Sequence, residues 1–221
     1  MSDHLTALDV FTPDECESIA DEVLKLDPYL IDRGGFWTLG AATYQDDPRA
    51  YPAIANAFNL ILDQAFGRMH ARVNGVLTEH FDAPVGRMVE GFGLPGFHVF
   101  DHTSNGQTGH PHIDEPFTRV DFGGLEWAMP FSFTLPVRIP TKGAGVDFWW
   151  DYTDADIEHY EMCNDLPEPT FEPYEIGKMY IHDGLTPHRI ASVAPIPEGE
   201  ERITLQGHGV HAADGTVIIY F

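Results

Sequence analysis

Residues 177–190 read GKMYIHDGLTPHRI, two short apolar runs separated by an Asp-Gly turn. The first run is rich in β-forming residues, and an Asp-Gly pair between two such runs is typical of a turn between strands. Runs of the same kind, bounded by Gly or Pro, recur on both sides of this stretch from residue 85 onward. We therefore expect eight strands, at residues 87–92, 96–101, 131–139, 145–152, 175–182, 188–194, 201–209 and 216–221.

The first third of the chain has a helical pattern instead. Residues 12–15, Thr-Pro-Asp-Glu, have the sequence of a capping box, and apolar residues then recur at helical spacing as far as the Asp-Pro pair at 27–28. A second helix is expected over residues 52–81. Gly67 and Gly75 can break this second helix in two, because glycine disfavours a helix interior.

The length and composition fit a single folded domain. The chain has 221 residues, of which 43% are hydrophobic and 12% aromatic, and this excludes intrinsic disorder. No internal repeat and no strand–helix alternation is present. The sequence predicts a mainly β protein: a jelly roll over residues 85–221, with the helices of residues 1–84 packed on one sheet.

The charge and the cysteines exclude several classes of function. Lys and Arg number 12 against 35 Asp and Glu, a net charge of −23, which disfavours nucleic acid and anionic membrane surfaces as partners. No run approaches the roughly 20 apolar residues of a membrane span, and no signal-peptide pattern opens the sequence. We expect a cytoplasmic protein. Its two cysteines form no CxxC pair, so neither a disulfide scaffold nor a thiolate zinc site is indicated.

One segment is strongly acidic. Residues 147–175 contain ten Asp and Glu and neither Lys nor Arg, and the part from 167 to 173 has too many prolines for a central strand. Two interpretations are open. The segment is a solvated surface insertion, or it is an acidic rim that attracts a cationic substrate next to the aromatic run at 148–152.

The tripeptide His112-Ile113-Asp114 is the main candidate for chemistry. In an extended segment residues i and i+2 point to the same face, so the imidazole and the carboxylate can converge on one cation. A third ligand from a distant strand would complete two His and one carboxylate on one face, the arrangement of non-haem Fe(II) oxygenases. An H-x-D tripeptide alone is a weak signal, since it also occurs by chance.

Two later elements strengthen this interpretation. The HRI sequence at 188–190 follows the turn, and Arg202 is followed two residues later by Thr204. The order of these elements after H-x-D resembles the Fe(II)/2-oxoglutarate-dependent oxygenases, particularly their prolyl-hydroxylase-like branch. The resemblance covers roughly residues 90–210.

This resemblance implies a double-stranded β-helix with an iron site formed by His112, Asp114 and His188. It also implies that Arg202 binds the distal carboxylate of 2-oxoglutarate, with Thr204 on the same strand face as a further donor. His182 is the competing third ligand, but it precedes the Asp-Gly turn, whereas the family ligand follows it. His208 shares the face of Arg202 at even spacing.

The sequence departs from the family at one position. No unambiguous tyrosine stands at the usual place upstream of H-x-D, where Phe97 and Phe100 are found instead, and Arg138 or a histidine is an alternative holder of 2-oxoglutarate. Asp114 itself argues for hydroxylation, since halogenating relatives have Gly or Ala there. Further candidates for contact with substrate are His98, His110 and either Trp149 or Trp150.

The resemblance implies an Fe(II)- and 2-oxoglutarate-dependent oxygenase that uses O2 and releases succinate and CO2. Its expected substrate is a small, amine-bearing or amino-acid-like molecule, which is hydroxylated or otherwise oxidised. The alternative is a non-catalytic, cupin-like jelly roll that binds a metal or senses a small ligand. Arg202 with Thr204 favours the oxygenase, because a simple cupin has no need of a keto-acid clamp. The sequence does not indicate an oligomeric state.

Overall fold

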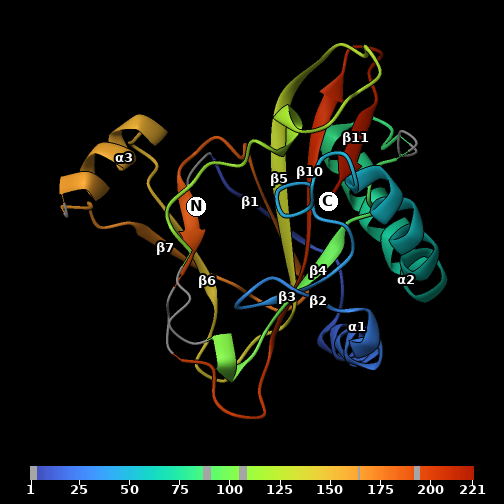
Figure 1. Ribbon diagram of the computed structural model, residues 1–221, viewed down its shortest axis with the longest axis horizontal. Helices are drawn as coiled ribbons and strands as arrows, with labels where there is room; N and C mark the ends of the chain where they lie inside the picture. Colours follow the sequence, from blue (N-terminus) through green and yellow to red (C-terminus); the bar gives the residue numbers. More distant parts are fainter. Residues whose placement is uncertain (1–3, 87–90, 105–108, 164, 192–194) are drawn as a thin grey trace.

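The computed structural model describes residues 4–86, 91–104, 109–163, 165–191 and 195–221. It is mainly β, with two antiparallel sheets and, among the described residues, three α-helices (Figure 1). The large sheet has the strand order β1-β8-β5-β10-β4-β3-β2, and β11 pairs with β10. Its strands are β1 (Thr6–Asp9), β2 (Ile31–Asp32), β3 (Trp37–Leu39), β4 (Gly96–Phe100), β5 (Trp127–Arg138), β8 (Lys178–His182), β10 (Arg202–Ala212) and β11 (Val217–Tyr220).

The small sheet faces the large one. Its strands, in the order β7-β6-β9, are β7 (Thr170–Pro173), β6 (Gly145–Phe148) and β9 (His188–Ile190). His112 extends this sheet beyond β9, because its backbone forms an antiparallel bridge with that of His188, with both N–H···O distances 2.9 Å. The proline-rich segment forms β7 at the opposite edge, where the N–H donor that proline lacks is not needed on the open side of the strand.

The first predicted helix begins and ends as expected. Helix α1 spans Pro13–Lys25, and its capping box forms: the Thr12 hydroxyl accepts from the Glu15 N–H, while the Glu15 carboxylate accepts from the Thr12 N–H at 2.8 Å. Helix α2 (Tyr51–Phe81) runs unbroken through both glycines. The expectation of a break was wrong, because packing against the sheet outweighs the intrinsic cost of glycine.

A third helix, α3 (Asp154–Cys163), lies within the acidic segment and was not expected. The Thr153 hydroxyl accepts from the Asp156 N–H, and the Asp156 carboxylate accepts from the Thr153 N–H at 2.9 Å. The Thr-x-x-Asp pattern was therefore a usable signal for this helix. None of the helices in the described part of the chain combines the length and the hydropathy needed to cross a bilayer.

Helices α1 and α2 cover the outer face of the large sheet (Figure 1). One apolar core joins them to the strands and includes Val23 of α1, Leu62 and Phe66 of α2, and Ile203 and Leu205 of β10, each at most 3% exposed. Alternate residues of β10 point to the other face, toward the small sheet. The large sheet is therefore apolar toward the helices and carries its polar residues on the inner side.

Several strand limits differ from the predicted ones. Residues 87–90 and 192–194, within two predicted strands, lie outside the described residues, and residues 91–92 form no strand. Strand β5 begins at Trp127 rather than 131, while β6 ends at Phe148 because the Trp149 N–H instead donates to the Pro187 carbonyl. The short strands β1, β2 and β3 were not predicted, since two to four residues carry no readable alternation.

A close contact shapes the wall of β4. Gly96 carries no side chain, and the ring of Phe221 occupies the space that a Cβ atom would need. The same ring lies 5.5 Å from the imidazole of His98 and 6.3 Å from the ring of Tyr44, measured between ring centres. Glycine at 96 therefore lets this aromatic ring support two side chains of the inner face.

Candidate active site

The two sheets enclose a cavity of about 570 Å³. Its walls come from the inner faces of β4, β5 and β10, from β9, and from the segment after residue 109. Apolar groups such as Phe36, Phe100 and Ile190 line it together with a small set of charged and polar groups. This is the composition of a site that holds a small molecule.

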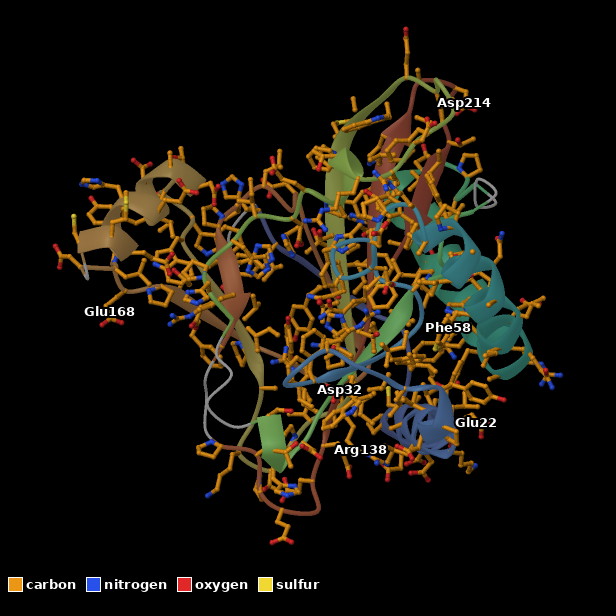
Figure 2. The ribbon with its side chains drawn as sticks, in the orientation of Figure 1. Glu22, Asp32, Phe58, Arg138, Glu168 and Asp214 are labelled. Atoms are coloured by element: carbon orange, nitrogen blue, oxygen red, sulfur yellow. The ribbon has the colours of Figure 1, made fainter. Side chains whose placement is uncertain are left out.

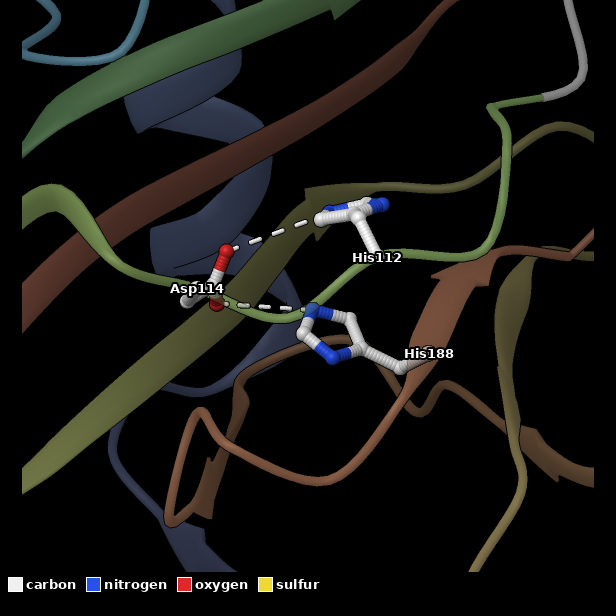
Figure 3. A group of neighbouring side chains, drawn as sticks. All are labelled: His112, Asp114 and His188. Carbon is white, nitrogen blue, oxygen red and sulfur yellow. Dashed lines mark ion pairs between the residues drawn. The ribbon is translucent and has the colours of Figure 1, made fainter. Parts of the chain in front are cut away.

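Three side chains at this cavity can hold a metal ion. The ligand atoms of His112, Asp114 and His188 all lie within 4.8 Å of one another (Figure 3). The Nε2 atoms of His112 and His188 are 3.9 Å and 3.4 Å from the two carboxylate oxygens of Asp114. The backbone bridge between the two histidines fixes their spacing, and the Asp114 N–H donates to the Gly184 carbonyl at 2.7 Å.

Hydrogen bonds orient both imidazoles for metal binding. The Nδ1 atom of His112 lies 2.8 Å from the His110 carbonyl, and that of His188 lies 2.8 Å from the Thr186 carbonyl. A carbonyl only accepts, so each Nδ1 carries a proton, and Nε2, on the side of Asp114, is the atom that each neutral imidazole can offer to a metal. Ligating histidines in metal sites are held in this way.

The electrostatics favour a charged carboxylate. Burial alone would raise the pKa of Asp114, but the imidazoles of His188 and His208 hold it well below its usual range. Burial lowers the pKa of His188, and the Asp114 carboxylate overcomes this effect and raises it. The pKa of His112 is lowered, by burial and by His188. The group thus presents an anion with two imidazoles, a set that suits a divalent transition metal.

The structure brings His188, not His182, to Asp114. The Nδ1 of His182 accepts the Gly184 N–H, and burial lowers the pKa of this imidazole to about 3. His208 reaches the site from β10, with Nδ1 2.9 Å from the Ser132 hydroxyl and 3.9 Å from an Asp114 oxygen. Its Nε2 is buried without a partner among the described residues. The even spacing between Arg202 and His208 along the strand was the sequence signal that both side chains point to the same face.

Arg202 lies at the inner wall of the cavity and is 5% exposed. Its guanidinium carbon is 5.5 Å from the ring centre of Phe100 and 5.4 Å from that of Tyr174. No carboxylate in the described part of the chain pairs with it, and its Nε has no hydrogen-bond partner there. Burial lowers its pKa, and the Tyr174 hydroxyl opposes that shift. A buried cation without a counter-charge indicates a site for an anion.

Thr204 and His98 lie close to Arg202. Thr204 is fully buried between Arg202 and Gln206 on the same strand face, but it is not among the residues that line the cavity. His98 does line it. Burial and the charge of Arg202 lower the pKa of His98 to about 3, and its Nδ1 is buried without a partner among the described residues.

Tyr44 is a cavity residue that the sequence did not reveal. Its hydroxyl forms a short hydrogen bond with the Nε2 of His98, and burial raises its pKa. It stands in an irregular segment anchored by Arg33, whose guanidinium donates to both oxygens of the buried Asp46 at 2.8 and 3.2 Å. Such a segment has no periodicity, so the sequence carries no signal for it. Tyr174, beside Arg202, follows the edge strand β7 and was missed for the same reason.

The other predicted contact residues lie elsewhere. Trp149, Trp150 and His110 are not among the residues lining the cavity. Trp149 is 1% exposed and donates to the Pro167 carbonyl, Trp150 stacks on Phe148, and His110 is an exposed partner of a glutamate on α3.

Arg138 also lies outside the cavity lining. It pairs with Glu17 and Asp21 of α1 at 2.9 and 2.7 Å and lies next to that helix (Figure 2). A third carboxylate, that of Glu201, is 3.4 Å away. Because three anions already engage this guanidinium, it does not offer a free site for 2-oxoglutarate.

The acidic segment contributes no carboxylate to the cavity lining. It forms the end of β6, helix α3 and β7, and α3 lies at the periphery of the molecule, beside the small sheet (Figure 1). Asp147, its first acid, pairs with Arg189 at 3.0 Å. The geometry therefore favours the solvated insertion over an acidic wall at the site.

Known structures share this fold. A structure described as a novel N-substituted L-amino acid dioxygenase from Burkholderia ambifaria AMMD matches with a TM-score of 0.63 at 14% identity, over 99% of this chain and 86% of that chain. The same dioxygenase in complex with alpha-KG matches with a TM-score of 0.61 at 14% identity, over the same shares of the two chains. HygX from Streptomyces hygroscopicus, with nickel and 2-oxoglutarate bound, gives 0.54 at 11% identity, over 93% and 82% of the two chains.

No family model matches the sequence, and no curated protein matches it significantly. At such low identities the structural likeness concerns the fold alone. At that level the resemblance to the Fe(II)/2-oxoglutarate-dependent oxygenases is confirmed.

Proposed function

We propose that this protein is an Fe(II)- and 2-oxoglutarate-dependent oxygenase that oxidises a small molecule and releases succinate and CO2. One observation carries the proposal: a His-Asp-His group and a buried, unpaired arginine line the same cavity. In the same proposal the two facing sheets are the halves of a double-stranded β-helix. The chain is then one domain, with residues 1–84 bracing the core of residues 85–221.

The residues present fit the metal. His112 and His188 offer Nε2 lone pairs, and Asp114 offers a charged carboxylate from the same side. Three protein ligands on one side leave other coordination positions open, as non-haem iron oxygenases require. Asp114 also favours hydroxylation or a related oxidation over halogenation, because a halogenating site has no carboxylate ligand there.

The residues also fit 2-oxoglutarate. Arg202 supplies a planar guanidinium for the distal carboxylate, and two parallel hydrogen bonds would orient the co-substrate. The buried Nδ1 of His98 and the Tyr174 hydroxyl are further polar groups around that end of the cavity. Thr204, the further donor expected on the strand face of Arg202, is fully buried and does not line the cavity, so its role stays an expectation.

The bound Fe(II), 2-oxoglutarate and O2 would supply the oxidising power for attack on a C–H bond. The chain's part is to hold and orient the reactants and to limit access of water. Phe36, Phe100 and Ile190 provide apolar surface for this purpose. A shielded, apolar wall suppresses side reactions of a reactive centre.

An amino-acid-like substrate fits this proposal. The structure with the largest TM-score among those described above is of a dioxygenase of N-substituted L-amino acids, and the cavity of about 570 Å³ suits a molecule of that size. The cytoplasmic location expected from the sequence stays a prediction.

Spectroscopy and binding test the proposal. Addition of Fe(II) and 2-oxoglutarate without oxygen should give a visible absorbance band from the chelated keto acid. The cupin-like alternative, a non-catalytic metal binder or sensor, predicts no such band and no succinate after oxygen is admitted. A metal-loaded protein that fails to bind 2-oxoglutarate would refute the oxygenase.

A further inference from the structure

Arg119 is the second arginine of the cavity lining, and the proposed chemistry gives it no role. Arg202 lies buried at the inner wall, whereas Arg119 is exposed. The two guanidiniums are thus distinct positive sites. In the proposed function one carboxylate of 2-oxoglutarate would bind at the metal and the other at Arg202, so neither would occupy Arg119.

The position of Arg119 is fixed by its neighbours. It follows the short 3-10 turn Pro116–Thr118, and its N–H donates to the Pro116 carbonyl at 2.9 Å. The side chain crosses to the segment of Tyr44, where Nη1 donates to the Tyr44 carbonyl at 3.1 Å. Because a guanidinium has five N–H donors, most of them remain free for a ligand. Arg119 comes five residues after Asp114, and the turn between them fixes its position relative to the proposed metal ligands.

The charge around Arg119 is unusual for this chain. Acidic residues outnumber basic ones by 35 to 12, yet no carboxylate in the described ranges lies within ion-pair distance of Arg119. Asp121, two residues away, accepts the Gly123 N–H instead. Gln45, also in the cavity lining, is a neutral group that can donate hydrogen bonds, whereas the Thr118 hydroxyl already donates to the Glu115 carbonyl at 2.7 Å. Apart from Asp114, Glu115 is the one acidic residue among the described residues that line the cavity.

We propose that Arg119 binds a carboxylate of the substrate, so that the substrates are small carboxylic acids of the amino-acid type. This inference rests on the proposed function and extends it to the substrate class. The guanidinium forms charge-assisted bonds with the carboxylate, while its bond to the Tyr44 carbonyl keeps it oriented. Substrate specificity then comes from this arginine and not from the acids of residues 147–175.

Paired ligands test the substrate class directly. Protein loaded with Ni(II) in place of iron and saturated with 2-oxoglutarate is titrated calorimetrically with L-amino acids and N-acyl-L-amino acids, each beside its primary amide. We expect acids to bind at least about 10-fold more tightly than their amides, as loss of charged hydrogen bonds implies. Arg119→Gln should weaken the acids by about the same factor and remove the preference over amides.

Arg49→Gln is the matched control. Arg49 is also exposed and has no ion pair among the described residues, but it does not line the cavity. Its substitution removes the same unit of charge, so it should leave the preference for acids intact. A similar loss in Arg49→Gln would mean that net charge, not a specific site, selects acids.

The remaining outcomes separate the two proposals. Equal binding of acids and amides, unchanged acid affinity in Arg119→Gln, or no binding by any acid would overturn the substrate class while 2-oxoglutarate binding stands. A tenfold loss of 2-oxoglutarate affinity in Arg119→Gln would assign Arg119 to the co-substrate and also overturn it. If the unaltered protein binds no 2-oxoglutarate, the oxygenase proposal itself fails.

Discussion

The two sheets contribute different parts of the site. The metal-binding group comes from the small sheet: His188 begins β9, and His112 extends the same sheet through its backbone bridge. The buried cation comes from the large sheet, where Arg202 begins β10. The cavity between them joins the proposed metal site on one wall to the proposed anion site on the other.

The two sheets also differ in support. The large sheet has α1 and α2 behind it and one extended apolar core. The small sheet has a minor cluster around Val146 and Phe148, an exposed edge strand β7 and the acidic helix α3. The large sheet therefore holds most of the apolar core, whereas the small sheet holds two of the three proposed metal ligands, which a few hydrogen bonds keep in place.

Loss of a metal ligand should have the largest effect. Asp114→Ala and His188→Ala should each lower metal affinity by more than about 100-fold and abolish succinate formation, because outer partners alone cost 10–100-fold. His182→Ala should keep metal binding, since this imidazole is outside the ligand group. Metal content after dialysis, measured by elemental analysis, checks this. Retention of iron in His188→Ala and its loss in His182→Ala would exchange the two roles.

Stability should follow the large sheet. Leu205 is fully buried against the helices, so Leu205→Ala should lower the free energy of unfolding by about 2–5 kcal/mol. Met162 on α3 is 76% exposed, and Met162→Ala should change it by less than about 0.5 kcal/mol. Urea unfolding followed by circular dichroism measures both. Comparable losses would mean that the small-sheet side shares the core.

The anion wall should respond separately from the metal wall. Arg202→Lys keeps the charge but loses the planar pair of donors, so 2-oxoglutarate should bind about 10-fold more weakly. Metal affinity should stay within error, because Arg202 is not a ligand. Calorimetry with Ni(II)-loaded protein gives both numbers. An unchanged affinity for 2-oxoglutarate would mean that the clamp lies elsewhere in the cavity.

The smallest effect is expected in the acidic segment. Asp151→Asn combined with Asp154→Asn should change turnover by less than about twofold, because neither side chain is buried and neither lines the cavity. Initial rates at low and moderate salt are the measurement. A large loss of turnover in the double variant, matched by a similar loss when salt is added to the unaltered protein, would support the acidic rim for a cationic substrate.

The sequence predicted what depends on local patterns. Alternation along β10 predicted that Arg202 and His208 share a face, and they do. The capping box of α1 followed from four residues. The triad spacing came from a family resemblance, and the structure brings these three side chains together.

What failed to appear in the sequence depends on long-range packing. Tyr44 and Tyr174 reach the cavity from irregular or edge segments, where no period marks the inward side. Trp149 and Trp150 alternate as if one faced the cavity, but β6 ends before them at Phe148. Trp149 donates its backbone N–H to the Pro187 carbonyl and its indole N–H to the Pro167 carbonyl, contacts that no local pattern contains.

The glycine at position 96 has a consequence for how this protein can evolve. A methyl group there would overlap the ring of Phe221, which in turn supports His98 and Tyr44. Any side chain at 96 would thus disturb the cavity without touching a reactant. Natural variation should reshape the mouth, where Gln45 and Thr118 are exposed, far more freely than this wall. We therefore expect substrate specificity to change through substitutions at the mouth of the cavity, while the residues of the inner wall are retained.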